Sequence, residues 1–261
     1  MNENTIALLE NRKSCRSFLP QIVEEQVVNR LKELTLRAPS AGNMEMYTII
    51  EVKDEEKKAK LATLCDNQIM IAKAPLVWVF LADMTKWLEY FRLGSCDKKV
   101  DIPIREVGLG DLHLALQDTI IAGQNCVVAA EALGLASCYI GDVIENYEEL
   151  QKLLNLPPHA VPACMLIMGY PKESLKDRVL TKRPPKDSTI FMIDEYKSHT
   201  LESLSYQYSK MEKDLKAHNL LTEEQIFADH YYKRKFSSSF MKEMNRSTKV
   251  FIERWCKNEH E

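Results

Sequence analysis

The chain of 261 residues contains few glycines and none of the glycine-rich loops that hold nucleotide phosphates. Of its eight glycines, only Gly108 and Gly110 form a GxG stretch, which has no third glycine and follows no clear strand. This argues against a Rossmann fingerprint. The sequence also has no P-loop, no GxSxG elbow and no HExxH helix. Side chains must therefore hold any phosphate that the protein binds.

Cysteine and histidine are present, but neither has the spacing of a metal site. The seven cysteines include no CxxC pair, and the six histidines include no HxxxH pair. An odd number of scattered cysteines is typical of small buried side chains in a reducing compartment. The sequence therefore predicts no metal site and no disulfide framework.

The charges and the apolar runs are those of an ordinary globular protein. Lysine and arginine number 35 against 38 acidic residues, a net charge of -3, which argues against a generic nucleic-acid binder. The most apolar short run, 74–82, is too short to cross a bilayer as a helix. The N-terminus has no apolar core or cleavage site typical of a signal peptide. We expect a cytoplasmic protein with no membrane or nucleic-acid partner.

Hydrophobic spacing predicts an α/β body followed by a helical tail. Asp111 is expected to cap the longest helix and Gly134 to end it. After about residue 197 the chain becomes more polar. The division expected is a body over 1–197 and a C-terminal helical extension over 198–261, which either wraps a partner subunit or packs on its own body. Helices are predicted over 24–37, 54–66, 111–133, 148–154, 200–217 and 222–233, and strands over 47–52, 76–81, 161–168 and the start of 133–142.

A short N-terminal segment concentrates positive charge beside a hydroxyl group. In an extended segment, alternation sends Arg12, Ser14 and Arg16 to the same side, with Lys13 and Cys15 between them. The planar guanidinium group suits a phosphate, which it binds through two hydrogen bonds. The segment is a candidate pocket for a phosphomonoester, and the alternative is a solvated basic turn.

Four further segments carry polar groups at positions where the chain is expected to turn. Each of them alone also fits an ordinary surface turn or polar pair. A glycine such as Gly141 lets the backbone approach a ligand closely. The segments are Pro39-Ser40-Ala41-Gly42-Asn43, Asn67-Gln68, Tyr139-Ile140-Gly141-Asp142 and Lys182-Arg183-Pro184-Pro185.

In this order and at these separations, the segments resemble the FMN-dependent nitroreductase family. The similarity covers residues 5–197 and is greatest to the branch of NAD(P)H-dependent nitroreductases and flavin reductases with a longer C-terminal region. The matching features are an RxSxR-like segment, a PSxxN turn, the central helix, a YIG loop and a late basic element. The resemblance implies an α+β fold, a mixed sheet flanked by helices, and a homodimer with two FMN sites at its interface. The helix over 111–133 is the candidate dimer contact.

The resemblance also implies roles for individual residues. One group binds the FMN phosphate, assisted by Lys182, and another contacts the flavin from the same or the other subunit. Gln68 is expected to form a hydrogen bond with the isoalloxazine ring or the ribityl chain. The backbone of the YIG loop is expected to face the reactive side of that ring, including N5. The residues expected to bind the phosphate are Arg12, Ser14, Arg16 and Arg183, and Lys13 beside them is also expected to bind the cofactor. The residues expected to contact the flavin are Ser40 and Asn43, and the YIG loop supplies Ile140, Gly141 and Asp142.

Two positions depart from the family pattern. Glu45 replaces the usual glutamine after the PSxxN turn, and Asp142 stands where many relatives have glycine. Both changes bear on flavin potential or on the choice of substrate.

The activity implied by the resemblance is ping-pong transfer of electrons from NAD(P)H through FMN to a nitroaromatic, a quinone or a flavin. Because the cofactor supplies the chemistry, no catalytic side chain is expected. The branch favours NADPH, and Lys233-Arg234-Lys235 offers cations for its 2′-phosphate. The alternatives are another flavin enzyme on this fold, of the reductive dehalogenase or flavin-fragmenting type, and a non-enzymatic FMN-binding sensor or storage protein.

Overall fold

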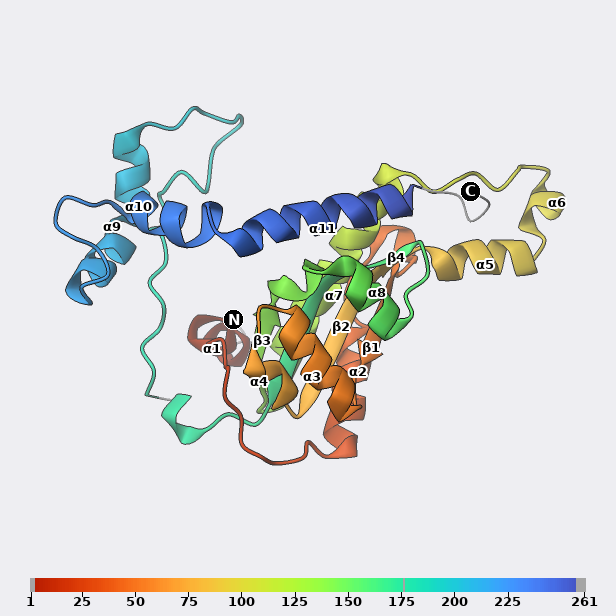
Figure 1. Cartoon of the computed structure of the whole chain (residues 1–261), viewed down its shortest axis with the longest axis horizontal. Coiled ribbons are helices and arrows are strands. Elements are labelled where there is room, and N and C mark those ends of the chain that lie inside the picture. Colours follow the sequence, from red (N-terminus) through yellow and green to blue (C-terminus); the bar gives the residue numbers. More distant parts are fainter. Residues whose placement is uncertain (1–2, 176, 257–261) are drawn as a thin grey trace. The chain divides into compact units, whose positions relative to one another are not determined.

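A computed structural model describes residues 3–175 and 177–256, which divide into two compact units (Figure 1). The first, called the sheet unit here, comprises the chain up to Arg178 and from Glu243 onward. The second, the helical unit, is Val179–Lys242. The fold is α+β, as expected. The boundary at residue 197 and the description of 198–261 as an extension of the same domain stay predictions.

The core of the sheet unit is a four-stranded sheet with strand order β1-β2-β4-β3. All three pairings between these strands are antiparallel, and β1 and β3 are the edge strands. Among the described residues, parallel pairing occurs at an isolated bridge between Ser14 and Ser137. The strands are β1 (Tyr47–Glu51), β2 (Leu76–Asp83), β3 (Ala136–Ile140) and β4 (Ala160–Gly169).

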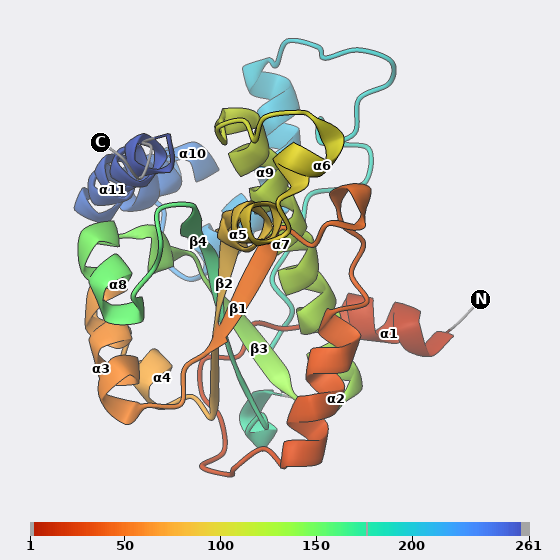
Figure 2. The ribbon, with the colours of Figure 1, turned by 90° about the vertical axis from the view of Figure 1, so that its right-hand side faces the viewer.

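Strand β2 shows how the sequence builds two hydrophobic layers. Because side chains alternate along a strand, Trp78 and Phe80 face one layer, whereas Val77 and Val79 face the other. The first layer is completed by α2 (Glu25–Thr35) and α7 (Leu109–Ala132), and the second by α3 (Glu55–Leu64), α4 (Ile69–Ala72) and α8 (Tyr147–Leu154). Figure 2 shows these two groups of helices on opposite faces of the sheet. The expectation that β2 is buried on both faces is confirmed.

The central helix begins earlier than its sequence suggests. Helix α7 starts at Leu109, and its N-cap is Gly108 rather than Asp111. Asp111 is the third helical residue, where its carboxylate accepts a hydrogen bond from the Gly108 N–H (2.8 Å) and pairs with Arg105. The capping prediction for Asp111 was therefore wrong by three residues, because a carboxylate in the first turn stabilises the helix as well as one at the cap. Gly134 follows the helix with φ of 78°, as a terminating glycine should.

Besides the one-turn helix α4, four further helices were not anticipated from the sequence. They are short, or flanked by residues that give no strong boundary signal; α6, for example, lies between the left-handed residues Ser95 and Asp101. The four are α1 (Glu3–Asn11), α5 (Thr85–Leu93), α6 (Cys96–Val100) and α11 (Ser239–Trp255). No described helix combines the length and the apolar character that crossing a membrane requires.

The helical unit contains α9 (Leu201–Ala217) and α10 (Phe227–Tyr231), followed by a π-helix over Tyr232–Phe236. Thr200 caps α9 by accepting a hydrogen bond from the Ser203 N–H (3.1 Å). The predicted helix over 200–217 is confirmed, and the one over 222–233 begins only at Phe227. The ring of Phe227 stacks on Tyr208, with centroids 4.8 Å apart.

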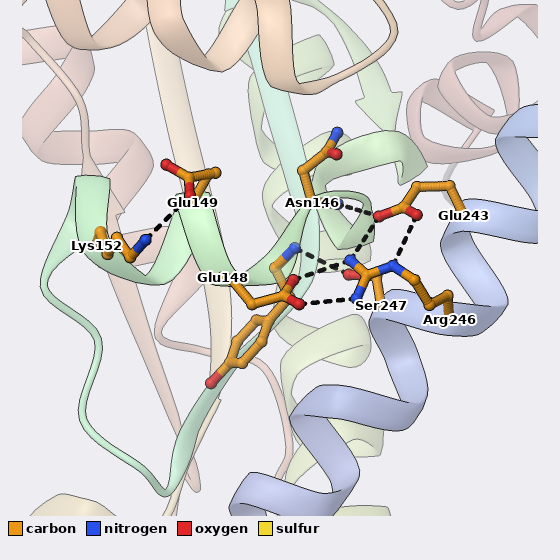
Figure 3. Close-up of polar contacts among 8 residues, drawn as sticks. Asn146, Glu148, Glu149, Lys152, Glu243, Arg246 and Ser247 are labelled. Carbon is orange, nitrogen blue, oxygen red and sulfur yellow. Dashed lines mark hydrogen bonds and ion pairs between the residues drawn. The ribbon is translucent and has the colours of Figure 1, made fainter.

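The last helix returns to the sheet unit and is fixed there by both polar and apolar contacts. Figure 3 shows Arg246 of α11 between Glu148 and Glu243, with two hydrogen bonds of 2.7 and 2.9 Å to the Glu148 carboxylate. These bonds lower the pKa of Glu148 to about 2. Phe251 and Trp255 of the same helix are buried in the core. The end of the chain therefore contributes to the stability of the sheet unit.

Candidate functional site

The segment over residues 12–16, called the arginine segment here, lies along the free edge of β3. The chain is extended after α1, Ser14 bridges Ser137, and the Cys15 N–H donates to the Ser137 carbonyl (2.8 Å). Cys15 is only 2% exposed, whereas Arg16 is exposed and Arg12 is half-buried. Cys15 therefore takes an inward position, and the expectation that Arg12, Ser14 and Arg16 share one side stays a prediction.

Three guanidinium groups gather around the start of β3. Burial raises the pKa of the Cys138 thiol, and the positive charges of Arg16, Arg12 and Arg178 oppose that increase. Arg178 also donates a hydrogen bond to the Ser14 carbonyl (3.1 Å). No sequence pattern pointed to Arg178, since it lies 164 residues from Ser14 and in no recognisable motif. This edge of the sheet is a concentrated positive site suited to a phosphate dianion.

Two other groups border the arginine segment. Lys13 donates to the Leu175 carbonyl (3.2 Å), which ties the segment to the chain that follows β4. Glu131, near the end of α7, is half-buried; burial raises its pKa, and the charge of Arg12 opposes the increase. Arg12 is thus close enough to Glu131 for their charges to interact.

The other end of β3 brings together two residues that the sequence had only suggested separately. The Gln68 side-chain amide donates to the Asp142 carboxylate (2.8 Å). Gln68 precedes α4, and Asp142 follows Gly141 at the end of β3. Ser137 and Gly141 are four residues apart, which corresponds to about 13 Å along a strand. The arginine segment and the Gln68–Asp142 pair therefore lie along one edge of the sheet.

The backbone at Gly141 is open, and Ile140 before it is buried. Among the described residues, no atom beyond its chain neighbours lies within 4 Å of the position that a Cβ at Gly141 would occupy. A flat ligand therefore has access to the main chain at this point.

The turn from Ser40 to Met46 has an unusual backbone. Gly42, Asn43 and Glu45 all have positive φ, at 58°, 56° and 51°. Such conformations are costly for residues other than glycine, and they often occur at functional sites. The Ser40 hydroxyl accepts a hydrogen bond from the Glu45 N–H (3.1 Å), and Asn43 is exposed.

Within one chain, this turn is far from the arginine segment. Tyr47, after the turn, pairs with Ala82 at one end of the sheet, where Ala82 pairs with Val161. Ser137, beside Ser14, pairs with Met168 at the other end of β4. The separation is about 20 Å along the strands and about 14 Å across the four-stranded sheet. One FMN molecule cannot contact both groups in the same chain.

Lys182 and Arg183 belong to the helical unit, and both are exposed. The Arg183 guanidinium donates to the carbonyl groups of Thr181 (3.4 Å) and Lys182 (3.3 Å). Their part in a phosphate site stays a prediction.

The residues along β3 fit a flavin mononucleotide. Exposed and half-buried arginines at one end match the phosphate, and open backbone beside a side-chain amide at the other end matches the ring. The model of the family described as the nitroreductase family matches residues 9–170 of this chain. The chain belongs to the nitroreductase family.

Individual relatives agree with this assignment. The chain is 30% identical to an FMN reductase (NADPH) of Bacillus subtilis over 64% of its own length and 66% of that protein. It is 32% identical to an oxygen-insensitive NADPH nitroreductase of Salmonella typhimurium over 67% of its own length and 70% of that protein. For the NfrA1 nitroreductase structure from Bacillus subtilis the TM-score is 0.78, with 24% identity, covering 95% of this chain and 98% of that one. This last similarity shows that the chain has the same fold as that structure.

Proposed function

We propose that this protein is an FMN-dependent oxidoreductase that takes electrons from NAD(P)H and passes them, by a ping-pong mechanism, to small acceptors such as nitroaromatics, quinones or flavins. The observation that carries the proposal is the positive segment beside the start of β3, together with the open backbone of Gly141 at the end of the same strand. The names of the relatives, FMN reductase and NADPH nitroreductase, support the same reaction class.

In this proposal the chain's own residues bind and orient the cofactor. Arg12, Ser14 and Arg16 hold the phosphate, with Arg178 beside them, and Lys13 fixes the segment through Leu175. Lys182 and Arg183 are proposed as phosphate ligands on the family resemblance alone. Gln68 and the backbone at 140–142 hold the ring. When bound, FMN supplies the electron-transfer chemistry. Glu45 and Asp142 place carboxylates near the site, so they disfavour anionic acceptors.

We further propose that the protein works as a cytoplasmic homodimer. The turn carrying Ser40 and Asn43 lies too far from the arginine segment of its own chain, so it serves the site of the other chain. Leu114, Ile120 and Ile121 of α7 are 41–44% exposed and lie on one side of the helix. An apolar stripe of this kind is typical of an interface between copies.

NADPH is the proposed electron donor. Lys233, Arg234 and Lys235 are exposed on the π-helix of the helical unit, and NADPH differs from NADH by a 2′-phosphate that cations recognise. π-helical turns often occur at functional sites. The tail over 198–261 thus serves coenzyme binding in this proposal.

Purified protein mixed with FMN tests the function. The proposal predicts a bound flavin that absorbs near ~450 nm, a property of the cofactor, and loses that absorbance rapidly when NADPH is added without oxygen. Protein that takes up no FMN would refute the proposal. Bound flavin that NADPH and NADH reduce slowly or not at all would indicate a sensor instead.

A further inference from the structure

The carboxylate of Asp118 joins the two ends of the Ser40–Met46 turn. Its Oδ1 atom accepts a hydrogen bond from the Ala41 N–H (2.8 Å), and its Oδ2 atom accepts one from the Met46 N–H (3.3 Å). Asp118 lies in the first half of α7 and is only 2% exposed. A buried carboxylate of α7 thus holds a turn that carries the exposed residue Asn43.

A carboxylate suits this position because it only accepts hydrogen bonds and has two oxygens. Between the two N–H groups lie Gly42, Asn43 and Glu45, all in the left-handed conformation. Conformations of this kind persist only where the surrounding structure holds them. Joining both ends of the turn restricts the chain to this arrangement.

Neighbouring contacts hold the end of the turn as well. The Trp87 indole N–H donates to the Met44 carbonyl (2.8 Å), and the Lys86 ammonium donates to the Tyr47 carbonyl (2.7 Å). Burial lowers the pKa of Lys86, whereas the negative charges of Asp83, Glu45 and Asp118 oppose the decrease. Asp118 differs from these groups because it contacts both ends of the turn.

We propose that Asp118 is a positioning residue for the flavin site, since it fixes the turn that presents Ser40 and Asn43 to the FMN of the other subunit. This inference rests on the proposed function. Asp118 touches neither FMN nor a substrate, and its effect passes through the backbone of the turn.

Asp118→Asn tests the inference, because the amide keeps the shape but turns a donor toward one of the two N–H groups. Hydrogen exchange of the flavin-free protein is expected to show faster exchange at Ala41 and Met46. The Kd for FMN is expected to rise about tenfold, or 1.4 kcal/mol. Asp111→Asn is the matched control on the same helix, with unchanged FMN affinity expected.

A second variant approaches the same contact from the turn. Ala41→Pro removes the N–H group that donates a hydrogen bond to Asp118. Proline is compatible with this position because Ala41 is the first residue of a helical turn. If Asp118 acts through this bond, the effects of Asp118→Asn and Ala41→Pro on FMN affinity are less than additive. This variant also keeps the inference testable if Asp118→Asn does not fold.

The outcomes separate this inference from the proposed function. Wild-type protein that binds no FMN would refute the proposed function, whereas the exchange data would still report on the turn. Wild-type FMN binding with an unchanged Kd in Asp118→Asn would refute the positioning role alone. Unchanged exchange at Ala41 and Met46 would refute the restraint of the turn itself.

Discussion

Replacing Arg16 by alanine should weaken FMN binding through the phosphate alone. Arg16 is exposed, so the free energy of unfolding should change by no more than about 0.5 kcal/mol. A hydrogen bond to a charged group contributes about 1.5–3 kcal/mol. Losing that contact raises the Kd for FMN by roughly 10- to 150-fold. The loss should shrink at high salt, because salt screens charges at an exposed site.

Riboflavin makes this test specific, since it has the same ring and ribityl chain as FMN but no phosphate. Fluorescence titration of the flavin-free protein should show weaker FMN binding in Arg16→Ala and unchanged riboflavin binding. Arg30→Ala is a matched control, because Arg30 is an exposed arginine of α2 that pairs with Glu33. Equal losses for FMN and riboflavin, or no loss for FMN, would refute the assignment of Arg16 to the phosphate.

Three further predictions concern stability, pH and assembly. Trp255 is fully buried and donates to the Gly108 carbonyl (3.1 Å), so Trp255→Ala should lower the free energy of unfolding by about 3–5 kcal/mol in urea denaturation; a loss below 1 kcal/mol would contradict the docking of α11. Arg246 lowers the pKa of Glu148 from 4.5 to about 2, so this pair stabilises the fold at neutral pH and loses its effect as pH falls through that range. Thermal melts of Glu148→Gln should therefore be less sensitive to acid than wild type, and an identical pH profile would count against the pair. If the protein is the proposed homodimer, Ile121→Glu should convert it to monomer in analytical ultracentrifugation, and a dimer that persists would exclude this face of α7.

Much of the sheet unit was predictable because its signals are local. The apolar run over 76–81 predicted a strand buried on both faces, and β2 is buried on both sides. The strand expected after residue 133 is also present, as β3 over Ala136–Ile140. The family resemblance is confirmed by the match over residues 9–170.

The rest depends on contacts between distant parts of the chain. Arg178 meets Ser14, and Asp118 holds Ala41, across separations of 164 and 77 residues. No local pattern marks either residue, since Arg178 lies in a loop and Asp118 lies in the interior of a mostly apolar helix. The sequence also did not indicate that Trp255 returns to the sheet unit, because a polar tail carries no information about where it packs.

Whether each flavin site is shared between two chains can be measured in a heterodimer. One chain carries Arg12→Ala and Arg16→Ala, and the other carries Ser40→Ala and Asn43→Gly, the latter keeping the left-handed backbone. Each variant alone should retain little FMN and show little NADPH-dependent flavin reduction. The isolated heterodimer has one intact site of two and should recover about half of the wild-type FMN occupancy and activity. A heterodimer no better than the two variant homodimers would contradict a site built from both chains.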